Sequence, residues 1–170
     1  EGRYASRLGQ EFMVLANQEA AKGEGKVDAE KLRIYVNNAI YFSKSGADLM
    51  PNDALSVSVL AQIYESLALY ANNALGSASE TYERLLTLEP HNPLAYLKLG
   101  QIKIVPAISE KDEEKKKQSI QEAQDFFKKA IVEKANYAEA HYYLAVTQNA
   151  LGQKDAVIDS MFEAVKNENN

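Results

Sequence analysis

A leucine followed directly by a glycine or an alanine recurs four times along the chain, each time inside a stretch of helical periodicity. The four pairs are Leu8-Gly9, Leu60-Ala61, Leu99-Gly100 and Leu144-Ala145. Small residues at one recurring place mark points where two helix axes approach closely, because no bulky side chain intervenes. The chain is therefore predicted to consist of repeated, closely packed helices.

Apolar residues recur three and four positions apart through most of the chain, and strand patterns are nearly absent. Glycine and proline interrupt the helical pattern. Eight helices fit between the interruptions, at roughly 3–22, 28–47, 53–71, 77–88, 93–105, 113–134, 137–150 and 153–166. The predicted fold class is all-α.

Three further segments carry a resemblance to a known family. The segments 48–53 (Asp-Leu-Met-Pro-Asn-Asp) and 87–92 (Thr-Leu-Glu-Pro-His-Asn) each place a Leu-x-Pro group before a new helix. The segment 138–145 reads Ala-Glu-Ala-His-Tyr-Tyr-Leu-Ala. With the leucine–small pairs, this pattern resembles the tetratricopeptide repeat (TPR), a helix–turn–helix unit of 34 residues.

In that family, two small residues seven positions apart recur in the second helix. The corresponding pairs are Ala39 and Gly46, Ala78 and Leu85, Ala123 and Ala130, and Val157 and Ala164. Ten of the twelve small-residue positions hold Ala or Gly, which together make up under a fifth of the chain. The resemblance implies a right-handed superhelical stack of about four hairpins in a single domain. The repeats are placed at roughly 2–53, 54–92, 93–137 and 138–170.

Charge and composition exclude several classes of function. The net charge is −5, whereas a nucleic-acid-binding protein needs a basic face. The chain has no cysteine, which excludes disulfides, thiolate catalysis and cysteine-ligated metal. No apolar run is long enough to cross a bilayer, so direct membrane insertion is not expected.

The sequence offers no strong catalytic or metal motif. The segment Gly-Glu-Gly-Lys at 23–26 lacks the spacing and the following Ser or Thr of a phosphate-binding loop, which favours a helix–helix turn. His91 is expected in a turn and His141 in packing, and neither has a second histidine at metal-ligand spacing. We expect no enzyme activity, no metal and no cofactor.

The resemblance implies a binding surface as well. First helices of this family line a concave groove that holds peptides, and we expect a peptide segment or a partner helix there. The matching positions are Gln10, Met13, Gln62, Leu94, Leu97, Gln101, Ile104, Tyr142, Val146 and Asn149. A glutamine amide both donates and accepts, so the three recurring glutamines suit a peptide backbone. The alternative is that glutamine is simply a good exposed helix former.

The last predicted helix carries apolar residues that its own hairpin cannot all cover: Ile158, Met161, Phe162 and Val165. Repeat arrays normally end on a polar capping helix. We therefore expect either that the chain is a segment of a longer protein or that this face self-associates.

Two alternative functions stay open. Residues 3–10 and 13–20 loosely resemble the TPR tail of bacterial membrane proteins similar to O-antigen ligases or polymerases, which implies an extracytoplasmic accessory domain. The other alternative is a structural spacer or self-association unit. The compartment is open between cytoplasmic and, for such a tail, extracytoplasmic.

Overall fold

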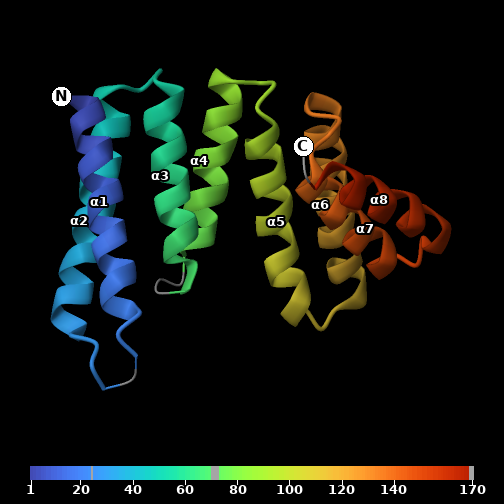
Figure 1. Cartoon of the computed structure of the whole chain (residues 1–170), viewed down its shortest axis with the longest axis horizontal. Helices are drawn as coiled ribbons and strands as arrows, with labels where there is room; N and C mark the ends of the chain where they lie inside the picture. The colour runs from blue at the N-terminus through green and yellow to red at the C-terminus, as the bar shows by residue number, and fades with distance from the viewer. Residues whose placement is uncertain (24, 70–72, 169–170) are drawn as a thin grey trace. The chain divides into compact units, whose positions relative to one another are not determined.

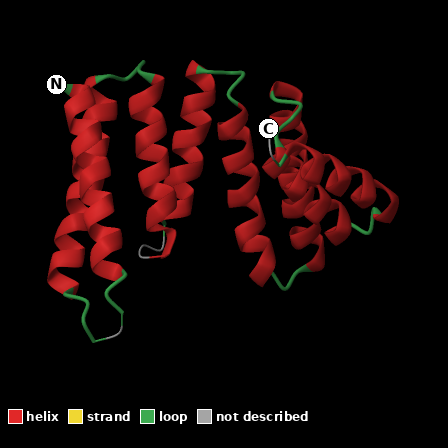
Figure 2. Cartoon of the chain, in the orientation of Figure 1, coloured by secondary structure: helices red, strands yellow, loops and turns green. Residues whose placement is uncertain are grey.

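The structure is a computed structural model that describes residues 1–23, 25–69 and 73–168 (Figure 1). The described residues form eight α-helices and a short 3-10 turn, η1 (Leu67–Leu69), without any strand (Figure 2). The helices are α1 (Gly2–Ala20), α2 (Ala29–Leu49), α3 (Ala54–Ser66), α4 (Ala74–Leu88), α5 (Pro93–Ser109), α6 (Glu113–Glu133), α7 (Ala138–Ala150) and α8 (Lys154–Asn167). The predicted all-α class is confirmed.

The chain divides into two compact units, Glu1–Glu89 and Pro90–Asn170. The first unit contains the hairpins α1–α2 and α3–α4, and the second contains α5–α6 and α7–α8. The two helices of each hairpin run antiparallel (Figure 1). The division falls close to the predicted boundary between the second and third repeats.

Side chains at the helix ends explain where the helices begin and stop. Four helices follow an Asp or Asn whose side-chain oxygen accepts backbone N–H groups of the first turn. These caps are Asp28 for α2, Asp53 for α3, Asn92 for α5 and Asp112 for α6. At the end of α7, Gly152 has a φ of 74°, and Gln153 N–H donates to the Gln148 carbonyl over 2.9 Å. This is a Schellman ending, which needs a residue that tolerates positive φ.

Three predicted boundaries were wrong. Helix α5 continues through Pro106 to Ser109, beyond the predicted end at 105. Pro106 removes one helical hydrogen bond, and the buried side chain of Ala107 holds the last turn in place. Helix α4 begins at Ala74 rather than 77, since one glycine, Gly76, costs a helix only about 1 kcal/mol. The third predicted helix ends early at Ser66, and its predicted residues 70 and 71 lie outside the described residues.

The small residues lie where helices touch, as predicted. A Cβ on Gly9 would lie 2.8 Å from the backbone nitrogen of Ser43. A Cβ on Gly100 would lie 2.5 Å from the Phe127 ring. Larger residues at these glycines would force the two helices of the hairpin apart.

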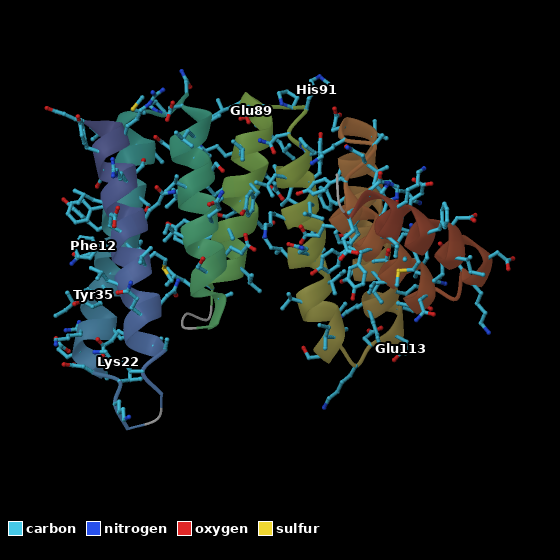
Figure 3. All side chains as sticks on the ribbon, in the orientation of Figure 1. Phe12, Lys22, Tyr35, Glu89, His91 and Glu113 are labelled. Atoms are coloured by element: carbon cyan, nitrogen blue, oxygen red, sulfur yellow. The ribbon has the colours of Figure 1, made fainter. Side chains whose placement is uncertain are left out.

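Each unit has its own apolar core. In the first unit, Met13, Ala16, Ala39, Val59, Ile63, Leu67 and Ala74 form one buried cluster. Phe12 of α1 and Tyr35 of α2 pack against it, with ring centroids 6.3 Å apart (Figure 3). In the second unit, Leu97, Ala123, Phe127, Ala130, Ala140 and Leu144 form another. These clusters leave the outward faces of the first helices free to form surfaces.

Candidate interaction surface

A groove runs between α1 and α3 in the first unit. It consists of two adjoining hollows of 310 and 160 Å³, and Gln10 and Val59 line both. Gln62 lines the smaller hollow, so the structure brings Gln10 and Gln62 to one groove. The other residues that line the two hollows are Arg3, Ser6, Arg7, Glu11, Met13, Val14, Asn17, Leu55, Ser56, Ile63 and Ser66. We call this set of residues the α1–α3 groove.

The charged end of the α1–α3 groove is held by hydrogen bonds. The Asp53 carboxylate accepts from the Ser56 hydroxyl over 2.7 Å and from the Ser56 N–H over 3.0 Å, and Arg3 donates to it over 3.1 Å. The Ser56 contacts, followed by Arg3, lower the pKa of Asp53. The Arg3 and Arg7 side chains remain 70% and 78% exposed. This end of the groove therefore presents two exposed guanidinium groups, of which Arg3 pairs with Asp53 and Arg7 with Glu11.

The remaining predicted groove residues lie in the second unit. Gln101 of α5 donates to Glu139 of α7 over 2.9 Å, so its amide is already engaged. Leu94 and Ile104 are half-buried on α5. Tyr142, Val146 and Asn149 are exposed on α7, and their spacing of four and three places them on one helix face.

Two predicted groove residues are core residues instead. Met13 is 5% exposed and Leu97 is fully buried, and both belong to the apolar clusters of their units. The next hairpin packs on these positions, because an apolar side chain between two hairpins gains more from burial than from exposure. Met13 thus contributes only to the floor of the α1–α3 groove, and Leu97 is not available for a partner.

The last hairpin has an open hollow of 390 Å³ between α7 and α8. Its lining residues are Ala138, Glu139, Tyr142, Met161, Ala164, Val165 and Glu168. We call this the terminal hollow. The apolar residues predicted to lie uncovered on α8 are exposed, with Ile158 at 72%, Phe162 at 66% and Val165 at 68%. Sequence reasoning missed that Tyr142 belongs to this hollow, since it compared first helices only with each other.

The two histidines considered as metal ligands make contacts within the protein instead. His91 Nδ1 lies 3.0 Å from Glu133, and His141 Nε2 donates to the Ala135 carbonyl over 2.9 Å. Within the described part of the chain, no group of three or more His, Asp or Glu residues could hold a metal ion. None of the described helices is both long and apolar enough to span a bilayer.

Gly23, Gly25 and Lys26 lie between the helices α1 and α2, as predicted for a helix–helix turn. Gly23 and Gly25 have positive φ values of 82° and 76°, and Lys26 N–H donates to the Gly23 carbonyl over 3.1 Å. Glu24 lies outside the described residues. No strand precedes this turn among the described residues, so a phosphate-binding loop does not form there.

Comparison with known proteins identifies the fold. No family profile and no curated protein matches the sequence. Among solved structures, the thermophilic TPR protein TTC0263 of Thermus thermophilus is similar, with a TM-score of 0.66 and 20% identity over 95% of this chain and 75% of that chain. This chain has the TPR fold. The MamA protein is similar at a TM-score of 0.62 and 19% identity, over 95% of this chain and 73% of that one.

A further MamA structure, MSR-1 C2, covers 99% of this chain and 92% of its own, with a TM-score of 0.59 and 13% identity. The TPR resemblance found in the sequence is confirmed at the level of the fold. The resemblance of the first twenty residues to glycan-ligase tails receives no support from these comparisons.

Proposed function

We propose that this TPR chain is a protein-interaction module that binds an extended peptide segment of a partner protein in the α1–α3 groove. The observation that carries the proposal is the pair of adjoining hollows that share Gln10 and Val59. The proposal includes no catalysis by the chain. In the second unit, the predicted groove residues that remain candidates are Leu94, Gln101, Ile104, Tyr142, Val146 and Asn149.

The groove chemistry suits a peptide backbone with apolar and acidic side chains. The Gln10 and Gln62 amides can each donate to a carbonyl and accept from an N–H. Leu55 is 62% exposed beside the buried Val59, so an apolar side chain of the peptide gains contact area there. The exposed Arg3 and Arg7 favour an acidic group at the same end.

A phage-displayed library of random short peptides, selected on the immobilised chain, tests this function. Leu55→Glu should weaken binding of the selected peptides by about tenfold or more, because it places a charge on the apolar part of the groove. Leu49→Glu is the matched control, since Leu49 is similarly exposed (60%) but lies on α2 outside the groove. Peptides that bind both variants as well as wild type would refute the groove assignment.

The location of binding is tested separately by NMR of the isotope-labelled chain, titrated with one selected peptide. Amide signals of Gln10 and Gln62 side chains should shift on titration, and Gln10→Ala together with Gln62→Ala should reduce the affinity. Shifts confined to the second unit would move the site away from the α1–α3 groove.

A further inference from the structure

The hairpin α5–α6 has positions equivalent to those that line the terminal hollow on the hairpin α7–α8. The repeat pattern aligns Leu99 with Leu144 in the first helices and Ala130 with Ala164 in the second. In this register Leu97 corresponds to Tyr142 and Phe127 to Met161. The two hairpins can therefore be compared position by position.

Helix α7 covers these positions on the hairpin α5–α6. Leu97, Phe127 and Ala130 are fully buried, in one cluster with Ala140 and Leu144 of α7. On the hairpin α7–α8, Tyr142 is 47% and Met161 41% exposed, and both line the terminal hollow. The terminal hollow is thus the repeat-equivalent of a place that an α-helix occupies inside the second unit.

Helix α1 has a face that is equivalent to the face of α7 that packs on the hairpin α5–α6. By the same register, Tyr4, Leu8 and Leu15 correspond to Ala140, Leu144 and Leu151 of α7. We call these three residues the α1 stripe. They are 77%, 45% and 38% exposed, although their equivalents on α3, which are Ser56, Leu60 and Leu67, are all buried. The α1 stripe is therefore a helix-packing face that this chain leaves uncovered.

Two glutamates line the terminal hollow, whereas two arginines, paired with Asp53 and Glu11, lie beside the α1 stripe. Glu139 and Glu168 line the terminal hollow, and none of the described residues in its lining is basic. Beside the α1 stripe, Arg3 and Arg7 expose most of their side chains. Glu11, which is paired with Arg7 at 4.0 Å, lies on the same helix. Glu11 corresponds to the buried Thr147 of α7, so we expect the α1 stripe to pack less tightly than α7 packs on the hairpin α5–α6.

From these observations we infer that two copies of the chain associate head to tail, with the α1 stripe of one copy in the terminal hollow of the next. Apolar contacts of Leu8 with Met161 and Tyr142 drive the association, and the arginines of α1 pair with the glutamates of the hollow. Because the two surfaces differ, the contact is heterologous and can propagate into rings or filaments. This inference does not rest on peptide binding, although Arg3 and Arg7 border both the α1 stripe and the α1–α3 groove.

Analytical ultracentrifugation of the 170-residue chain tests the inference. Wild type should associate with rising concentration. Leu8→Glu and Met161→Glu should each raise the dissociation constant by about tenfold or more. The matched control is Ile34→Glu, because Ile34 is as exposed as Leu8 (44%) but lies on α2 outside both surfaces. Circular dichroism of every variant checks that it is folded.

Mixing the two variants gives the decisive result. The Leu8→Glu chain keeps an intact terminal hollow, and the Met161→Glu chain keeps an intact α1 stripe. An equimolar mixture should therefore form a heterodimer and nothing larger.

A mixture of folded variants that stays monomeric would overturn the head-to-tail arrangement. Association that responds to Met161→Glu but not to Leu8→Glu would overturn it as well, since that pattern belongs to a symmetric contact of two terminal hollows. A wild-type chain that is monomeric at every concentration would overturn the inference too. Peptide binding in the α1–α3 groove should be unchanged by Met161→Glu, so the two proposals fail separately.

Discussion

Gly46 of α2 faces Ser6 of α1 at so short a distance that a Cβ on Gly46 would lie 2.8 Å from the Ser6 backbone nitrogen. The same Cβ would lie 2.9 Å from the Gly2 carbonyl oxygen, so backbone limits the approach on both sides. A flexible side chain can move away from such a contact, but a helix backbone cannot move without separating α1 from α2. The distance between these two helices therefore depends on Gly46.

We predict that Gly46→Ala lowers the free energy of unfolding of the first unit by about 1–3 kcal/mol, the usual cost of overpacking. Urea unfolding followed by circular dichroism measures this. Gly76→Ala is the control, because the Cβ there would meet, among the described residues, only the Asn73 side chain. It should be neutral or stabilise by up to about 1 kcal/mol, through helix propensity. Equal losses in the two variants would show that close approach is not the cause.

Leu97 and Tyr142 occupy equivalent positions in successive hairpins but should respond differently to truncation. Leu97→Ala removes a fully buried side chain and should destabilise the second unit by about 2–5 kcal/mol. Tyr142→Ala removes a half-exposed side chain and should cost less than about 1 kcal/mol. Thermal unfolding of both variants separates these outcomes. A larger loss for Tyr142→Ala would mean that the core of this unit is wrongly assigned.

Tyr82 should lose its stabilising effect at high pH. Its hydroxyl donates to the Glu65 carboxylate over 2.7 Å, and burial, together with this contact, raises the pKa of Tyr82 above its ordinary value of 10.0. A folded-state pKa above the unfolded one gives stability that is complete below pH 10.0 and is lost as the pH rises beyond it.

Tyr82→Phe should therefore destabilise the chain by about 1–2 kcal/mol at neutral pH and weaken the alkaline loss. Unfolding measured across the alkaline range tests both effects. Tyr41→Phe serves as the comparison, because Tyr41 is 65% exposed. An unchanged alkaline profile in Tyr82→Phe would contradict the assignment.

Glu19 joins the end of α1 to the start of α2, and its contribution should disappear in acid. Its carboxylate accepts from Lys22 over 2.6 Å and from the Asp28 N–H over 2.9 Å. The Lys22 contact, followed by the Asp28 N–H, lowers the pKa of Glu19 below 4.5. A lowered folded-state pKa gives stability that is present above pH 4.5 and is lost as the pH falls below it.

Glu19→Gln should consequently be less stable than wild type near neutral pH. The difference should shrink as the pH falls below 4.5, because the unfolded wild-type chain then binds a proton at Glu19 more readily than the folded chain does. Urea unfolding over a pH series gives the two curves. Parallel curves would show that the charge on Glu19 does not matter.

Much of the fold could be predicted from local patterns. The helix starts follow from capping residues such as Asp28 and Asp112, which act within one turn of their own position. The close helix contacts at Gly9 and Gly46 follow from the spacing of small residues. In the candidate site, Gln10 and Gln62 line the same hollow because both lie on equivalent faces of first helices; their role in binding a peptide stays a prediction.

The sequence by itself thus determined the helices and the faces that pack within each hairpin, because these depend on neighbours three, four and seven positions away. Only the tertiary structure decided which equivalent positions are covered. Leu97 is buried and Tyr142 is exposed at the same place in the repeat, because α7 packs on one and no described helix packs on the other. The physical reason is that burial depends on what a distant segment covers, and the pattern of a single helix does not contain that information.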